Sequence, residues 1–157
     1  MSKSTLWKKL ERTVANDIEG RVVKGSGSQL HAKGDVRSDV WLVECKSSVK
    51  DKVQVDFGWI AGIINHAKEI GHDWALAVGP NVKYTEEYFV FVDEGMAQFI
   101  LFASDYDIED IEIQGEKSAA VPFGDIDILG GPWRVKGKPW LIMNRTDFIR
   151  LDQKLRS

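Results

Sequence analysis

Two carboxylates and a lysine occur together in the segment Gly34–Lys46, which reads GDVRSDVWLVECK. Alternate side chains of an extended strand share a face, so we expect Glu44 and Lys46 to point the same way and Cys45 to point the opposite way. Asp35 is expected to come from the preceding strand of a hairpin. Two carboxylates and one ammonium at one spot are sufficient to hold a divalent metal ion and position a water, so the segment predicts phosphodiester hydrolysis by a nuclease.

Each member of this cluster has an expected role. Asp35 and Glu44 would bind the metal together with the backbone carbonyl of Cys45, because Mg²⁺ prefers oxygen ligands and keeps several waters. Lys46 would orient the attacking water or stabilise the charge that develops on the phosphate. Asp39 falls at the hairpin turn and is the second choice for the first carboxylate. The same pattern is also typical of a solvated hairpin with a surface ion pair, so it needs support from elsewhere in the chain.

A glutamate on the first helix is the next candidate. Glu11 falls at the margin of an apolar face that contains Trp7, Val14 and Ile18. A charge there is costly unless something pairs with it, so we expect Glu11 to reach the metal or a metal-bound water. Arg12 would contact a phosphate. The alternative is an ordinary ion pair in solvent.

A glycine- and serine-rich loop over residues 25–34 precedes the hairpin. Its backbone amides and small hydroxyls suit contact with phosphates, but it lacks the lysine and the spacing of a nucleotide-binding P-loop. The residues expected to contact the DNA backbone are Arg12, Ser26, Arg37, Lys50 and Lys52. A flexible loop and solvated surface charges are the alternative interpretation.

The hydrophobic periodicity of the first 92 residues predicts the elements that must position these side chains. A first helix is expected from an N-cap at Ser4 to about Glu19, with Gly20 as its stop. A second helix is expected over 57–70, where apolar residues recur at helical spacing. The remaining expected elements are a strand at 21–24, a hairpin over 35–46, a polar connector over 47–56, and strands at 74–78 and 88–92. This α-β-β-β-α-β order predicts an α/β fold with a central mixed β-sheet flanked by helices.

The pattern is weaker after residue 92. The expected elements are a short helix or strand over 96–103, a strand over 140–143 and a last helix capped by Thr146, with an acidic stretch at 105–116 and a turn-rich stretch at 122–139 between them. No internal repeat or low-complexity linker divides the chain. We therefore expect one domain over 1–157, with a core of about 5–92 and a C-terminal elaboration of about 93–157.

Composition is ordinary for a soluble globular protein, with 43% hydrophobic and 29% charged residues in 157. No apolar run approaches the roughly 20 residues that span a bilayer, and the N-terminus lacks the apolar core of a secretory signal. A single cysteine excludes an internal disulfide and any multi-cysteine zinc site. These features predict a cytoplasmic location and no membrane partner.

The net charge of −3 argues against a nucleic-acid partner, but its distribution reverses much of that. Residues 1–54 carry 11 Lys/Arg against 7 Asp/Glu, and residues 128–157 carry 7 against 2. Residues 93–127 carry 10 acidic residues and one lysine. Binding to phosphates depends on local basic surface rather than on the total, so binding to DNA stays compatible with this composition.

The order and spacing of these motifs resemble those of an archaeal-type Holliday junction resolvase of the PD-(D/E)xK nuclease superfamily. The resemblance rests on Glu11–Arg12 in the first helix, the serines of the loop, Asp35, and the Glu44-Cys45-Lys46 run, and it continues to the strand at 74–78. It covers roughly residues 5–92. Single motifs of this kind are unspecific, whereas their order and spacing together are distinctive.

The resemblance implies a restriction-endonuclease-like core and a homodimer that nicks a four-way DNA junction symmetrically. It implies Mg²⁺, with Mn²⁺ as a substitute, at Asp35 and Glu44. Glu11 and Lys46 would complete the active site, and a loop serine, Ser28 or Ser26, would assist. Recognition would depend on the shape of the branched DNA more than on its sequence.

The chain also departs from the family pattern. Asp35 lies closer to Glu44 than the corresponding aspartate of archaeal members usually does, and residues 93–157 exceed the compact family core. A viral or mobile-element origin, with action in the host cytoplasm, is compatible with this. Two alternatives stay open: a nuclease of the same superfamily that acts on ordinary duplexes in restriction or repair, and a non-catalytic DNA-binding protein on the same scaffold.

Overall fold

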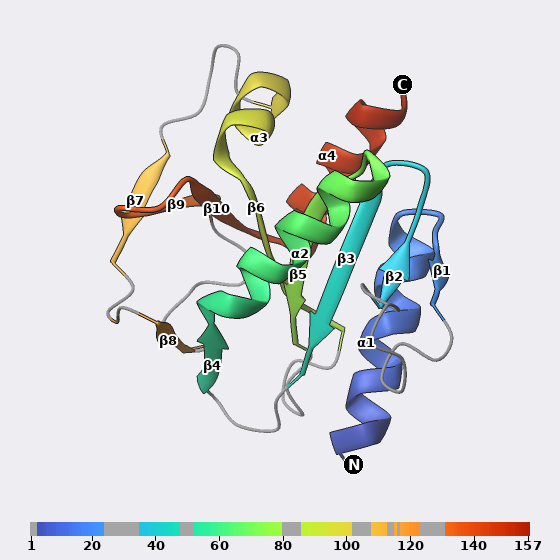
Figure 1. Ribbon diagram of the computed structural model, residues 1–157, viewed down its shortest axis with the longest axis horizontal. Helices are drawn as coiled ribbons and strands as arrows, with labels where there is room; N and C mark the ends of the chain where they lie inside the picture. The colour runs from blue at the N-terminus through green and yellow to red at the C-terminus, as the bar shows by residue number, and fades with distance from the viewer. Residues whose placement is uncertain are drawn as a thin grey trace.

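The computed structural model describes residues 3–23, 35–47, 52–79, 86–101, 108–112, 115, 117–122 and 131–157. Its elements in chain order are α1 (Lys3–Asp17), β1 (Arg21–Val22), β2 (Val36–Arg37), β3 (Trp41–Lys46), β4 (Lys52–Asp56), α2 (Phe57–Ile70), β5 (Asp73–Val78), β6 (Phe89–Asp93), α3 (Glu94–Leu101), β7 (Glu109–Ile111), β8 (Ser118–Pro122), β9 (Trp133–Val135), β10 (Trp140–Asn144) and α4 (Arg145–Arg156). An eight-stranded sheet has the order β1-β2-β3-β5-β6-β10-β9-β7, and β4 and β8 form a separate ribbon (Figure 1). The predicted mixed sheet flanked by helices is confirmed at this level.

The sheet separates two hydrophobic cores. Helices α1, α3 and α4 contribute to the core that contains Val43 and Cys45 of β3, and α2 packs on the other face against Leu42 (Figure 1). Successive side chains of β3 therefore alternate between the two cores, as they must in a strand that is covered on both faces. It also fixes which face of the sheet each side chain of β3 meets. In the described residues no helix has the length and apolar character needed to cross a membrane.

Several predicted elements of the first half are confirmed. The hairpin forms with β2 antiparallel to β3, and β5 then pairs in parallel with β3. Helix α2 has the predicted bounds: Asp56 caps its start by accepting a hydrogen bond from Gly58 N at 2.7 Å, and Gly71 ends it in the left-handed conformation at φ 70°. The connection from β3 through α2 to β5 is thus a parallel βαβ crossover.

The prediction for α1 is wrong in two details. The helix begins at Lys3, so Ser4 lies inside its first turn and is not the N-cap. Glu19, at φ 53°, and not Gly20, takes the left-handed conformation that ends the helix. Gly20 is required for a different reason, because a Cβ there would lie 2.8 Å from the carbonyl oxygen of Arg37.

The predicted apolar face of α1 is confirmed for Val14 and Ile18 and is wrong for Trp7. Trp7 is 37% exposed, whereas the buried row consists of Leu6, Leu10, Val14 and Ile18 at intervals of four. Residues four apart lie on one side of a helix, so this row faces the sheet and Trp7 lies beside it.

The stretch at 47–56, predicted as a polar connector, contains a strand. Residues 52–56 form β4, which pairs antiparallel with β8 in the register Val53↔Val121 and Val55↔Ala119. Val53 and Val55 are buried while Gln54 and Asp56 are exposed. The two-residue alternation of a half-buried strand was therefore present in the sequence, with charged residues in front of it.

The second half corrects further expectations. Asn144, not Thr146, caps α4, because its Oδ1 accepts a hydrogen bond from Asp147 N at 2.9 Å. The stretch predicted as helix or strand is the helix α3, and short strands β7 and β9 lie within the acidic and turn-rich stretches. The strand predicted at 140–143 is β10, which pairs antiparallel with both β6 and β9.

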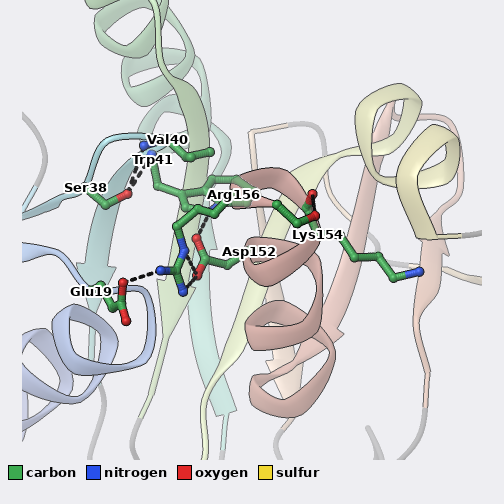
Figure 2. Close-up of polar contacts among 8 residues, drawn as sticks. Glu19, Ser38, Val40, Trp41, Asp152, Lys154 and Arg156 are labelled. Carbon is green, nitrogen blue, oxygen red and sulfur yellow. Dashed lines mark hydrogen bonds and ion pairs between the residues drawn. The ribbon is translucent and has the colours of Figure 1, made fainter.

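A buried carboxylate connects α4 with the rest of the fold (Figure 2). Asp152 is fully buried and accepts hydrogen bonds from Trp41 Nε1 at 3.1 Å and from Arg156 Nε at 2.9 Å. Arg156 also pairs with Glu19 at the end of α1. One carboxylate thus connects α4 with β3, and through Arg156 with α1.

Candidate active site

Asp35 directly precedes β2, and the pairing of β2 with β3 places its side chain at the backbone of Cys45, near the end of β3. Asp35 N donates to Val43 O at 2.8 Å, and the Asp35 Oδ2 atom accepts a hydrogen bond from Cys45 N at 2.8 Å. The aspartate side chain therefore provides the hydrogen-bond acceptor for the backbone amide of Cys45. The carboxylate of Asp35 is thereby held beside residue 45.

Glu44 and Lys46 lie side by side on the α2 face of the sheet. The Lys46 Nζ atom is 3.5 Å from Glu44 Oε1, and the two side chains are 35% and 26% exposed. Lys46 Nζ also lies 4.7 Å from the ring centroid of Trp59 in the first turn of α2. Cys45 is buried on the opposite face, as the alternation predicts.

Glu11 is buried on α1, with only 7% of its surface exposed. Burial and, second, the negative charge of Asp35 raise the pKa of Glu11 from 4.5 to about 7, although Lys8 opposes the shift. Helix α1 packs on the Cys45 side of the sheet, whereas Glu44 and Lys46 lie on the α2 side. Glu11 thus lies close enough to Asp35 to be affected by its charge, and it lies on the face of the sheet opposite to Glu44 and Lys46.

The thiol of Cys45 is affected by all of these groups. Burial raises its pKa most, the carboxylates of Asp35, Glu11 and Glu44 raise it further, and Lys46 opposes them. The thiol therefore stays protonated, which suits a small core residue and not a nucleophile. The structure thus brings Asp35 to the backbone of Cys45 and places Glu44 beside Lys46, while Glu11 lies on the opposite face of the sheet.

The donors suit a hard divalent cation. Asp35 and Glu44 offer carboxylate oxygens, and the backbone carbonyl of Cys45, the residue after Glu44, is a third oxygen donor. The charge of Asp35 disfavours ionisation of Glu11, a repulsion that a cation would relieve. Within the described ranges, however, no three or more His, Cys, Asp or Glu side chains form a group ready to hold a metal ion.

Comparison with known proteins gives a weak structural similarity and no sequence family. No protein-family model matches the chain, and no curated protein matches it. Among solved structures it is similar to Hjc, a Holliday junction resolvase from the archaeal hyperthermophile Archaeoglobus fulgidus, with a TM-score of 0.46 and 12% identity over 75% of this chain and 84% of that chain. A similarity this low establishes no shared function. The functional proposal therefore rests on the residues of this chain.

The predicted DNA-contacting residues are only partly described. Arg12 is exposed on α1 directly after Glu11, and Arg37 is half-buried on β2, where it pairs with Arg21 of β1. Lys52 begins β4. The other predicted residues, Ser26, Ser28 and Lys50, lie outside the described residues. Contact of this set with DNA stays a prediction.

Two further residues bear on the site. Asp39, the second choice for the first carboxylate, is exposed in the hairpin turn, at the opposite end of β2 from Asp35. Sequence reasoning missed Trp59. The signal that was available is an aromatic residue in the first turn of the helix that follows the strand carrying Lys46.

The raised pKa of Glu11 predicts a pH-dependent stability. The folded protein binds this proton more tightly than the unfolded chain, so ionisation of Glu11 lowers the free energy of unfolding as pH rises from 4.5 to about 7. Glu11→Gln cannot ionise. In metal-free buffer we expect the variant to match the wild type at about pH 4 and to be more stable by about 1–3 kcal/mol at about pH 8.

Urea denaturation across this pH range measures the difference. Glu109→Gln, an exposed site on β7, is the matched control and should show no such trend. A stability difference between Glu11→Gln and wild type that is the same at both pH values would contradict the prediction.

Proposed function

We propose that this chain is a metal-dependent endodeoxyribonuclease. The observation that supports it best is the gathering of Asp35, Glu44 and Lys46 around the backbone of Cys45, with Glu11 beside Asp35. Carboxylates and an ammonium in this arrangement are suited to phosphodiester hydrolysis. The described residues of this cluster include no hydroxyl or thiolate that could act as the nucleophile.

Each residue has a chemical task in this proposal. Asp35 and Glu44, with the Cys45 carbonyl, hold Mg²⁺, for which Mn²⁺ substitutes. When bound, the ion supplies activation of a water and neutralisation of charge on the phosphate. Lys46 donates hydrogen bonds to the phosphate oxygens as their charge grows. Glu11, with a pKa of about 7, can accept or return a proton near neutral pH.

The substrate that we propose is a four-way DNA junction, cut by paired symmetric nicks. The order of motifs from Glu11 to Lys46 supports this choice, because it resembles that of the junction resolvases. Symmetric nicking of two strands requires two sites, so we propose that a homodimer binds the branched DNA. The single, buried cysteine suits action in a reducing cytoplasm.

A cleavage assay tests the proposal. Labelled four-way junctions and linear duplexes of equal sequence are incubated with the protein in Mg²⁺, in Mn²⁺ and in excess chelator. We expect paired nicks in junctions only, with either metal and not with chelator. Equal rates on both substrates favour the duplex nuclease, and binding without any cutting favours the non-catalytic alternative.

Two matched variants identify the first carboxylate. Asp35→Asn should abolish cleavage, because it removes the charge beside Cys45, whereas Asp39→Asn makes the same change in the exposed turn and should cut as wild type does. The reverse outcome would assign the metal to the turn.

A further inference from the structure

The ammonium of Lys46 lies between two neighbours from different elements. Glu44 Oε1 of the same strand is 3.5 Å away, and the ring centroid of Trp59 on α2 is 4.7 Å away. A cation within about 6 Å of an indole face is attracted to it, and Trp is the best of the aromatic residues in this role. The carboxylate and the indole therefore both attract the ammonium and favour this position of Nζ.

The fold fixes the position of Trp59 independently of Lys46. Asp56 caps the first turn of α2 through Gly58 N, and Phe57 N donates to Lys117 O at 2.8 Å just before β8. The ribbon of β4 and β8 thus holds the beginning of α2. Trp59 is half-buried and packs at the edge of the core between α2 and the sheet.

We propose that Trp59 is a positioning residue for Lys46. It restricts the ammonium to the side of Glu44, where the phosphate is to be bound. This inference rests on the nuclease function proposed above and extends it to a residue that touches neither metal nor phosphate.

A lysine side chain needs such a restraint. It has four rotatable methylene carbons and a strongly hydrated charge, so at 35% exposure an unrestrained Lys46 would distribute over many rotamers. Only some of these place Nζ beside the scissile phosphate. Loss of the indole should therefore lower the rate of the chemical step and leave DNA binding unchanged.

Two substitutions separate the indole face from simple packing. Trp59→Leu keeps an apolar side chain but removes the aromatic face, and Trp59→Phe keeps a weaker face. We expect the single-turnover rate on saturating junction in Mg²⁺ to fall about tenfold in Trp59→Leu and to stay within about threefold of wild type in Trp59→Phe. The affinity for junction and the Mg²⁺ concentration at half-maximal rate should not change.

The contact itself has a readout that does not depend on activity. Methylene protons held over an aromatic ring resonate upfield, so a ¹H–¹³C spectrum of the full chain should contain a shifted Hε signal of Lys46 besides that of Lys138, whose Nζ lies over Phe57 and Trp140. The Lys46 signal should vanish in Lys46→Ala and in Trp59→Leu, and the Lys138 signal should stay. Trp133→Leu makes the same change at a partly buried tryptophan on β9 and should alter neither the Lys46 signal nor the rate.

Several outcomes would overturn the inference: no shifted Hε signal that is lost in Lys46→Ala, a Trp59→Leu variant that cuts as wild type does, an equal loss in Trp59→Leu and Trp59→Phe, or a loss confined to junction affinity. A shifted signal in a wild-type protein that cuts no DNA would instead show that the proposed function has failed, and the positioning role with it.

Discussion

Replacing Glu44 with glutamine or Lys46 with alanine is expected to abolish DNA cleavage while junction binding survives. Each change removes one of two charges that lie 3.5 Å apart at the end of β3. A positioned proton-transfer group or a donor for developing charge contributes about 10²–10⁴-fold to a rate, so either loss should bring cleavage close to background. Binding depends on the basic surface around the site, which both variants keep.

The two variants should differ in their response to metal. Glu44→Gln removes a proposed metal ligand, so excess Mn²⁺ should restore part of its activity, whereas Lys46→Ala should not respond. Lys68→Ala and Glu69→Gln make similar changes at exposed positions in the last turn of α2 and serve as controls. Single-turnover cleavage and gel-shift binding are the measurements. Wild-type cutting by either site variant would refute the assignment of the site.

Replacing Asp152 with alanine should cause the largest loss of stability. The fully buried indole N–H of Trp41 would lose its acceptor, and Arg156 would lose the carboxylate that Figure 2 shows beside it. An unsatisfied buried donor costs about 1–3 kcal/mol, whereas Arg156 is exposed and water replaces its lost partner, so we expect a loss of about 1–3 kcal/mol.

Urea denaturation measures this loss, and two variants make it specific. Asp152→Asn keeps an oxygen that can accept from Trp41 and should lose less than Asp152→Ala. Gln153→Ala changes the exposed neighbour on α4 and should be nearly neutral. Equal stability of Asp152→Ala and wild type would mean that the network contributes nothing.

Local sequence patterns were sufficient for the elements that carry the candidate site. The apolar spacing of Phe57–Ile70 and the glycine after it determine α2, because helical periodicity and a left-handed stop are both local properties. The alternation of Glu44, Cys45 and Lys46 followed likewise from strand geometry. The face of each residue was therefore predictable before any tertiary contact was known.

Long-range pairing was not predictable in the same way. Residues 52–56 form a strand because β8, more than 60 residues later in the chain, pairs with them. Trp59 meets Lys46 only because α2 crosses back over β3. Asn144 caps α4 in place of Thr146 because β10 runs directly into the helix, a boundary that periodicity does not resolve.

The central place of β6 in the sheet has a consequence for protein engineering. This strand is hydrogen-bonded to β5 on one side and to β10 on the other, so residues 140–144 cover an edge of the strand that ends at Asp93. A fragment cut after residue 93 would leave one edge of β6, a strand of five mostly apolar residues, without a hydrogen-bonded neighbour. That edge would be a template for pairing between molecules. Such a fragment would aggregate, and any shortening of this chain must retain the late strand β10.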